Sequence, residues 1–141
     1  MTHTRTRILI VDDERQNRQL LEVLLAPEGY VLDTASSAEE AMIAVLRQRP
    51  DLILLDVMMP GMDGYQLVGR LKANADTATI PIVMLTALDD RNSRSHGLAV
   101  GAAAFLTKPV DRHLLSETVS GLLIARERTR TSDAASPPPI P

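Results

Sequence analysis

The sequence Leu-Ile-Leu-Leu-Asp-Val-Met-Met-Pro-Gly-Met-Asp-Gly occupies residues 52–64, near the middle of the chain. Four consecutive aliphatic residues lead directly to Asp56, and a Pro-Gly pair follows within five residues. A short, unbroken apolar run bounded by turn residues is typical of a strand that is covered on both faces. This segment therefore predicts a buried strand that carries one carboxylate to its carboxyl end.

Four further apolar runs indicate four more strands. Together with residues 52–55, the expected strands are residues 7–11, 30–34, 82–86 and 104–107. The segments between them have apolar residues at helical spacing, within residues 20–25, 41–45, 67–71 and 114–123. Strands that alternate with helices predict an α/β fold, in which a parallel sheet is covered by helices on both faces.

Helix-starting signals support this alternation. Ser37 and Glu40 have the spacing of a capping box, and Asp63 and Asp111 precede two other helical segments. Residues 89–100 are also expected to be helical, although several of them are weak helix formers. We therefore expect five helices, one after each strand.

The composition is that of one soluble globular domain. The chain has 141 residues, of which 45% are hydrophobic and 23% charged, and it has no cysteine. A disulfide scaffold, a thiolate metal site and a cysteine nucleophile are thereby excluded. The net charge of −3 argues against a broad nucleic-acid surface. Since no apolar run approaches the roughly 18 residues of a membrane span, a cytoplasmic protein without a membrane partner is expected.

The composition changes after Ala125. Residues 126–130 are charged, and residues 131–141 are small, polar and rich in proline. Such a segment is typical of a flexible tail or linker. We therefore expect a disordered N-terminus at residues 1–6, one folded domain at residues 7–125 and a flexible tail at residues 126–141.

Polar residues lie at the ends of four of the five expected strands. Asp12 and Asp13 follow the first strand, Asp56 the third, Thr86 ends the fourth, and Lys108 follows the fifth. In an open parallel sheet the carboxyl ends of the strands form the ligand site. Three neighbouring carboxylates repel one another unless a cation lies among them, and hard oxygen ligands suit Mg²⁺. The sequence thus predicts a Mg²⁺ site beside an aspartate that can attack phosphorus.

Each of these residues also has an ordinary structural interpretation when it is taken alone. Asp12 or Asp13 could cap the helix that begins near Glu14. Thr86 could simply end a strand, and a single lysine such as Lys108 is usually solvated. The functional interpretation depends on the convergence of all five residues at one edge of the sheet.

Four motifs, in this order, make the sequence resemble the receiver domain of bacterial two-component response regulators, in particular chemotaxis-type regulators. They are Ile-Leu-Ile-Val-Asp-Asp at residues 8–13, the stretch at 52–64, Val-Met-Leu-Thr-Ala at 83–87 and Phe-Leu-Thr-Lys-Pro at 105–109. The resemblance covers about residues 7–125. It implies a flavodoxin-like fold, with a five-stranded parallel sheet of order 2-1-3-4-5 and helices on both faces.

The resemblance also implies the roles of the site residues. Asp56 matches the phosphoacceptor of the family, and Lys108 matches the lysine that binds the phosphoryl group. Asp12, Asp13 and Asp56, with the backbone carbonyl of Met58, match the ligands of Mg²⁺, for which Mn²⁺ can substitute. All of these positions carry the residue types that the family requires.

A conformational switch is implied as well. Thr86 matches the switch hydroxyl, Phe105 matches the switch aromatic, and a cis peptide bond is expected between Lys108 and Pro109. The surface that would respond consists of the fourth helix, the fifth strand and the fifth helix, and a homodimer through this surface is possible. Residues 101–104, Gly-Ala-Ala-Ala, depart from the acidic residues that many relatives carry here.

A signalling role in a phosphorelay, rather than an enzyme with a separate substrate, follows from the resemblance. The phosphoryl donor would be a sensor histidine kinase or a histidine phosphotransfer protein, recognised by residues 14–19 and the loop after Pro109. The chain would be a single-domain regulator or a receiver cut from a longer regulator or hybrid kinase, acting on an output protein or an output domain outside this sequence. Direct binding of nucleic acid is not expected.

Two other functions are less compatible with the sequence. A haloacid-dehalogenase-type phosphatase uses the same kinds of residue but needs a second aspartate two residues after the first. Met58 holds that position, and a thioether cannot transfer a proton. A nucleotide- or flavin-binding module would need a glycine-rich phosphate loop after the first strand, where the sequence has Asp12 and Asp13.

Overall fold

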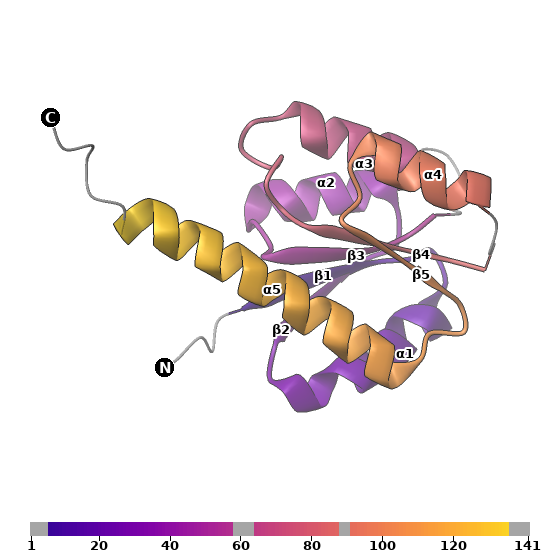
Figure 1. Cartoon of the computed structure of the whole chain (residues 1–141). Helices are drawn as coiled ribbons and strands as arrows, with labels where there is room; N and C mark the ends of the chain where they lie inside the picture. Colours follow the sequence, from indigo (N-terminus) through magenta and orange to yellow (C-terminus); the bar gives the residue numbers. More distant parts are fainter. Residues whose placement is uncertain (1–5, 58–63, 88–90, 136–141) are drawn as a thin grey trace, which may run out of the picture.

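Five parallel strands form one sheet, with the order β2-β1-β3-β4-β5 (Figure 1). The computed structural model describes residues 6–57, 64–87 and 91–135, and of residues 91–94 and 129–135 it describes the backbone alone. The strands are β1 (Arg7–Val11), β2 (Val31–Ala35), β3 (Leu52–Asp56), β4 (Ile82–Thr86) and β5 (Ala104–Thr107). The predicted α/β, flavodoxin-like fold is confirmed, strand order included.

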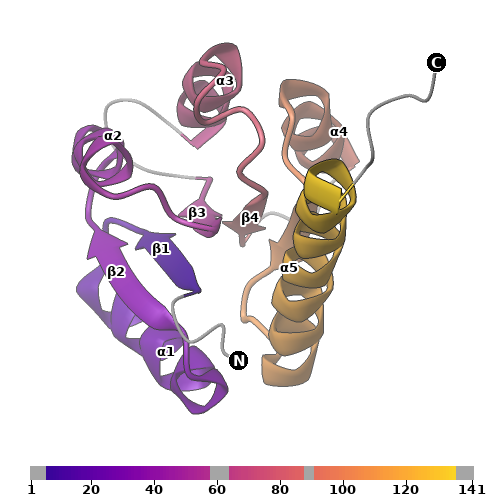
Figure 2. The same ribbon diagram turned by 90° about the vertical axis from the view of Figure 1, so that its left-hand side faces the viewer.

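Helices cover both faces of this sheet. They are α1 (Arg15–Leu25), the short 3₁₀ helix η1 (Ala26–Glu28), α2 (Ala38–Arg47), α3 (Gly64–Ala73), α4 (Arg91–Val100) and α5 (Arg112–Ala135). Figure 2 shows α1 and α5 on one face and α2, α3 and α4 on the other. The result is a three-layer sandwich in which the carboxyl ends of all five strands lie at the same edge of the middle layer.

Two hydrophobic cores separate the three layers. Side chains alternate along a strand, so Leu9 and Val11 of β1 pack toward α2 and α3, whereas Ile8 and Ile10 pack toward α1 and α5. All five residues of β3 and all five of β4 are buried. Continuous burial on both faces explains why these strands appear in the sequence as unbroken aliphatic runs.

The capping signals predicted two helix starts correctly. The hydroxyl of Ser37 accepts a hydrogen bond from the backbone N–H of Glu40 at 3.1 Å. Asp111 Oδ2 accepts one from the backbone N–H of Leu114 at 2.8 Å. Glu40 completes its box with Ser36 rather than Ser37, and these bonds lower the pKa of the Glu40 carboxyl. Asp63 lies outside the described residues.

Two strands differ from the prediction by one residue. β2 occupies Val31–Ala35 rather than residues 30–34, because its register begins where the Val31 N–H donates to the carbonyl of Thr6 at 2.9 Å. β3 includes Asp56 itself, which pairs with Leu85 of β4. The last residue of the central strand is therefore the aspartate that the sequence singled out.

The fifth helix is longer than the sequence predicted. α5 continues ten residues past Ala125 to Ala135, through a segment that was expected to belong to a flexible tail. Its charged residues are good helix formers, and the first proline after Pro109 is Pro137. Arg126 also anchors the extension, since Nη1 donates to the backbone carbonyl of Asp51 at 2.6 Å. Figure 1 shows this part of α5 projecting beyond the sheet.

Within the described ranges, no helix combines the length and the apolarity that crossing a membrane requires. α5 is long enough, with 24 residues, but charged residues are spread along it. At the other end of the chain, Thr6 is joined to β2 through its carbonyl, whereas residues 1–5 lie outside the described part.

Candidate functional site

The carboxyl ends of β1 and β3 bring three carboxylates together. Asp12 is fully buried, Asp56 is 5% exposed and Asp13 is exposed. Carboxylate oxygens of the three residues all lie within 4.8 Å of one another. The convergence that the sequence predicted for these residues is therefore present. One member of the cluster faces solvent, which leaves a route by which an ion or a substrate can enter.

Lys108, which follows β5, contacts two of these carboxylates. Its Nζ lies 3.2 Å from Asp56 Oδ1 and 3.3 Å from Asp12 Oδ2. Burial alone would lower the pKa of the Lys108 ammonium, but the charges and hydrogen bonds of Asp56 and Asp12 outweigh that cost and raise the pKa. The ammonium therefore stays charged and lies directly beside the oxygen of Asp56.

Asp12 is fixed by backbone contacts before any ligand arrives. Its N–H donates to the carbonyl of Ala35 at 3.1 Å, and its Oδ1 accepts from the Glu14 N–H at 2.9 Å. Arg18 donates to the backbone carbonyl of Asp12 at 2.8 Å. Sequence reasoning missed Arg18, because nothing in the local pattern signals that a helical arginine turns back to the preceding loop. Asp12 thus stabilises the turn before α1 through its side chain and also belongs to the acidic cluster.

Thr86 and Phe105 lie on the same side of the sheet. Thr86 is the fully buried last residue of β4, and its carbonyl accepts from the Lys108 N–H at 2.6 Å. Phe105 is half-buried on β5, where its register partner is Met84. Met84 and Thr86 are two residues apart on one strand and point to the same face. The ring of Phe105 is therefore a diagonal neighbour of Thr86.

The remaining predicted positions have different outcomes. The Lys108–Pro109 peptide bond is cis, as expected. Met58, whose backbone carbonyl was expected to be a metal ligand, lies outside the described residues.

The donor set fits a hard divalent cation. Three carboxylates within 4.8 Å of one another carry more negative charge than the single ammonium of Lys108 can neutralise. Oxygen-only donors at this spacing suit Mg²⁺ or Mn²⁺, which take part of their coordination from water. Among the described residues, Asp12, Asp13 and Asp56 form a group that can hold such an ion.

A hollow of about 350 Å³ lies next to the carboxylates. Asp12 and Lys108 form its polar end. Its other walls come from the start of α1, including Asn17 and Leu20, and from the loop at Pro109 and Val110. A partner that reaches Asp56 from this side would contact the first turns of α1 and the loop after β5.

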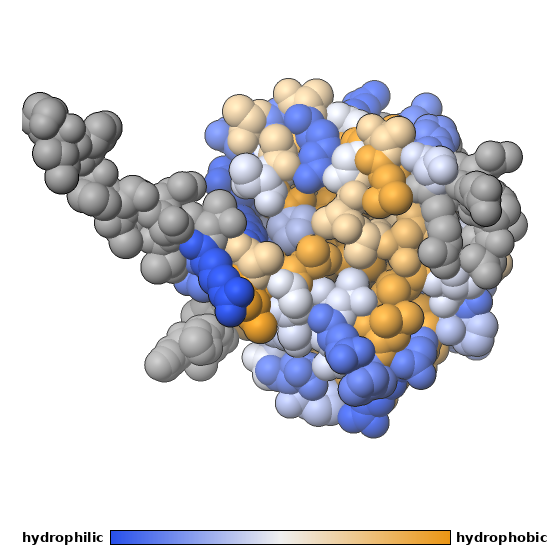
Figure 3. Space-filling view, viewed as in Figure 1, coloured by the Kyte–Doolittle hydropathy of each residue, from blue (hydrophilic) through white to orange (hydrophobic). Residues whose placement is uncertain are grey.

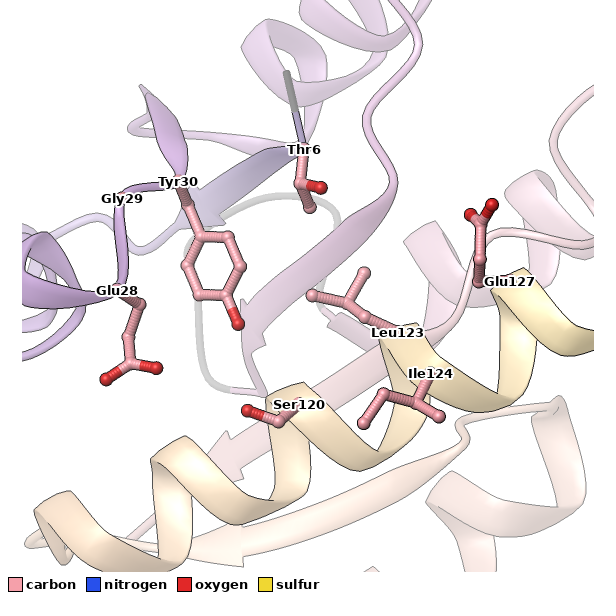
Figure 4. A pocket seen from close by; sticks show the side chains of 8 residues that line it. All are labelled: Thr6, Glu28, Gly29, Tyr30, Ser120, Leu123, Ile124 and Glu127. Atoms are coloured by element: carbon pink, nitrogen blue, oxygen red, sulfur yellow. The ribbon is translucent and has the colours of Figure 1, made fainter. Parts of the chain in front are cut away.

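A second hollow lies away from the carboxylates and contains none of the predicted site residues. Figure 4 shows Tyr30, directly before β2, pointing toward Ser120, Leu123 and Ile124 of α5. Its volume is about 510 Å³. Its lining includes two carboxylates, Glu28 and Glu127, but none of Asp12, Asp13, Asp56 and Lys108, so this hollow is separate from the acidic cluster.

The face formed by α4, β5 and α5 carries exposed apolar side chains. Leu98 of α4 is 55% exposed and Leu114 of α5 is 48% exposed. Figure 3 shows a band of apolar side chains between α4 and the start of α5. The predicted response surface therefore carries apolar side chains that a protein contact could bury.

Comparison with known proteins gives a consistent result. The family model described as "Response regulator receiver domain" matches residues 8–120. Response regulator PleD of Caulobacter vibrioides is 48% identical over 116 residues, which cover 82% of this chain and 26% of PleD. The chain thus spans about a quarter of the length of that relative.

Solved structures agree with this match. A putative response regulator from Chloroflexus aurantiacus superposes with a TM-score of 0.82 at 37% identity, and the match covers 85% of this chain and 98% of that one. The signal receiver domain of a histidine kinase from Syntrophus aciditrophicus superposes with a TM-score of 0.78 at 35% identity. That match covers 96% of this chain and 97% of the other.

Proposed function

The chain belongs to the response regulator receiver family, and from this premise we propose that Asp56 is the residue on which it accepts a phosphoryl group. Receiver domains take phosphoryl groups from histidine kinases and act with output domains in two-component phosphorelays. The observation that carries the proposal is the position of Asp56, 5% exposed at the end of the central strand with the Lys108 ammonium 3.2 Å away.

The reaction is a transfer between two oxygen or nitrogen nucleophiles. A carboxylate oxygen of Asp56 attacks the phosphorus of the donor, a phosphohistidine or a small acyl phosphate. The new P–O bond forms as the P–N or P–O bond of the donor breaks, and the leaving group keeps that electron pair. Hydrolysis of the resulting acyl phosphate by water returns Asp56 to its starting form.

Lys108 and Thr86 stabilise the phosphoryl group once it is present. The ammonium of Lys108 already contacts Asp56 Oδ1, so it can contact a phosphoryl oxygen after only a small movement. Thr86 ends the neighbouring strand and can donate its hydroxyl to another oxygen. Lys108 therefore acts on the resting carboxylate as well as on the charge that develops during the transfer, whereas Thr86 would act on the transferred group.

A divalent cation would be held by Asp12, Asp13 and Asp56. When bound, Mg²⁺ would supply positive charge that offsets the carboxylates and the incoming phosphoryl oxygens. The support is the donor set, with three carboxylates inside 4.8 Å. Removal of the cation with EDTA should therefore slow phosphorylation strongly.

Phosphorylation should be read at the surface of α4, β5 and α5. If Thr86 moves toward the phosphoryl group, it leaves space behind it into which the Phe105 ring can rotate. That rotation would alter the face that carries Leu98 and Leu114, where an output protein, an output domain or a second copy of the chain could bind. The donor would approach across the hollow beside Asn17, Leu20 and Pro109.

The test is the intact mass of the protein after incubation with acetyl phosphate and Mg²⁺. The wild type should gain the mass of one phosphoryl group, and Asp56→Asn should gain none. Asp33→Asn, which makes the same change on β2, should still be labelled. Full labelling of Asp56→Asn would refute the assignment.

A second assay separates a phosphoacceptor from a phosphatase. A phosphoacceptor should take up one phosphoryl group per chain and should not turn over an excess of a phosphomonoester such as p-nitrophenyl phosphate. Sustained turnover that Asp56→Asn abolishes would instead favour the haloacid-dehalogenase-type activity.

A further inference from the structure

Gly97, in the middle of α4, is the point at which this helix contacts the ring of Phe105. Gly97 is buried, and a Cβ atom placed on it would lie 2.6 and 2.9 Å from two carbon atoms of that ring. Carbon atoms in van der Waals contact are about 3.5–4.0 Å apart. The ring can therefore lie against the α4 backbone only because position 97 has no side chain.

Met84 lies on another side of the same position. The same Cβ would lie 3.2 Å from Sδ of Met84, which is fully buried. Cε of Met84 in turn lies 3.2 Å from the position that a Cβ of Gly64 would take, at the start of α3. The thioether thus lies close to both α3 and α4. Phe105 is only half-buried, so its ring is the group that would have to move.

Other helical glycines do not have this contact. A Cβ on Gly69 of α3, or on Gly121 of α5, would meet no atom within 4 Å. Glycine destabilises the interior of a helix relative to alanine at each of these positions. Of these three glycines, only Gly97 makes room for a neighbouring group by its lack of a side chain.

We propose that Gly97 is a positioning residue that holds the Phe105 ring against α4 in the unphosphorylated protein. The inference rests on the proposed function, in which the ring moves toward the space behind Thr86 after phosphorylation. A methyl group at position 97 would collide with the ring while the ring lies against α4, which is the first state. It would meet no ring after the ring has moved behind Thr86, which is the second state. Substitution therefore raises the free energy of the first state alone, and the equilibrium shifts toward the second.

The sequence provides a specific probe, because Phe105 is the only phenylalanine of the chain. An isotope label in phenylalanine rings therefore gives NMR signals from this ring alone. Without any phosphoryl donor, the signals of Gly97→Ala should move toward the positions that the wild type adopts with Mg²⁺ and beryllofluoride, a phosphoryl analogue. Gly69→Ala, the same change in open space, should leave them unmoved. Unmoved signals in Gly97→Ala, or movement in another direction, would overturn the inference.

A double-mutant cycle separates contact with the ring from a general effect on the helix. Gly97→Ala should accelerate phosphorylation by acetyl phosphate several-fold, because more of the protein is already in the receptive state. The acceleration should disappear when Gly97→Ala is combined with Phe105→Ala, since the added methyl group then meets no ring. An equal acceleration in the Phe105→Ala background would mean that helix propensity is the cause, and the inference would be wrong.

Failure of the inference differs from failure of the proposed function. If the wild type and Gly97→Ala both gain one phosphoryl group while their ring signals and rates agree, only the role of Gly97 is refuted. If neither protein gains a phosphoryl group, the proposed function is refuted, and the role of Gly97 in it falls as well.

Discussion

The two ends of the β-sheet differ in how their carboxylates are balanced by cations. At the amino end, Arg7 Nη1 lies 2.6 Å from Asp33 Oδ2, and Arg126 Nη1 lies 3.3 Å from Asp51 Oδ1. Asp51 Oδ2 also accepts the backbone N–H of Arg7 at 2.8 Å. Each of these two carboxylates therefore has its own guanidinium, and together they join β1, β2, β3 and α5.

At the carboxyl end, three carboxylates lie within 4.8 Å of one another, and two of them contact the same ammonium. Among the described side chains, Lys108 contacts Asp56 and Asp12, and Arg18 donates to the backbone carbonyl of Asp12 rather than to a carboxylate. Excess charge of one sign opposes folding unless something outside the chain compensates it. We call the two ends the balanced amino end and the unbalanced carboxyl end. The ion pairs of the balanced end join elements of the fold, whereas the excess negative charge of the unbalanced end favours binding of a cation.

The largest expected effect is on the rate of phosphorylation of Asp56, when Lys108 at the unbalanced carboxyl end is replaced. Lys108→Met should slow phosphorylation of Asp56 by acetyl phosphate by about 100-fold or more, because a preorganised charge beside the transferred group is lost. Affinity for Mg²⁺ should rise in the same variant, since one competing positive charge is removed. Rates from intact mass and Mg²⁺ titrations measure both quantities.

Arg126→Met is the matched control for that experiment. It removes a cation from the balanced end and should leave both the rate and the Mg²⁺ affinity unchanged. If the two variants lost activity equally, the contrast between the ends would have no functional meaning.

A second pair of variants should change stability in opposite directions. Asp13→Asn should stabilise the metal-free protein by about 1 kcal/mol, because it relieves repulsion among the three carboxylates. Asp51→Asn should destabilise it by about 1–2 kcal/mol. Arg126 would lose its charged acceptor, and the backbone N–H of Arg7 would donate to a neutral amide oxygen, which is a weaker acceptor than a carboxylate. Urea unfolding in EDTA gives both values. Destabilisation by Asp13→Asn would contradict the account of the acidic cluster.

Addition of Mg²⁺ sharpens this pair further. The wild type and Asp51→Asn should both gain stability from the ion, since binding to the folded state alone stabilises it. Asp13→Asn should gain little, because it lacks one ligand. An equal gain in all three proteins would place the ion elsewhere.

A third prediction concerns transmission from the unbalanced end to α4. Thr86→Ala should still accept phosphate at Asp56, but hydrogen exchange across residues 91–100 should change little on phosphorylation. The wild type should show a clear change in this helix under the same conditions. A mutant that responds as strongly as the wild type would show that Thr86 is not the transmitting residue.

Much of the fold could be predicted from the sequence because the relevant signals are local. Continuous aliphatic runs identified β3 and β4, and the hydroxyl of Ser37 and the carboxylate of Asp111 identified two helix starts. The residues of the acidic cluster could also be predicted, since parallel strands bring their ends to one edge. Topology alone therefore placed Asp12, Asp13 and Asp56 together.

The features that the sequence did not predict depend on contacts between distant segments. Arg126 belongs to the folded domain because it forms an ion pair with Asp51, which is 75 residues away in the sequence. No local sequence pattern predicts that pair. Arg18 turning back to Asp12 and Gly97 lying on Phe105 are of the same kind. Composition suggested a tail after Ala125, whereas a single long-range ion pair and good helix formers extend α5 instead.

The smallest expected effect tests that extension. Arg126 is 15% exposed and Asp51 30% exposed at the side chain, so their pair is partly shielded from water. Arg126→Met keeps an apolar stem of similar length but removes the hydrogen bonds to Asp51, which should cost about 1 kcal/mol. Because the lost contact is the one that anchors the distal part of α5, the backbone amides beyond Ala125 should exchange faster than in the wild type. Arg128→Met, on the exposed side of the same helix, should change exchange there far less. Equal exchange in the two variants would mean that helix propensity alone, and not the balanced amino end of the sheet, holds the extension of α5.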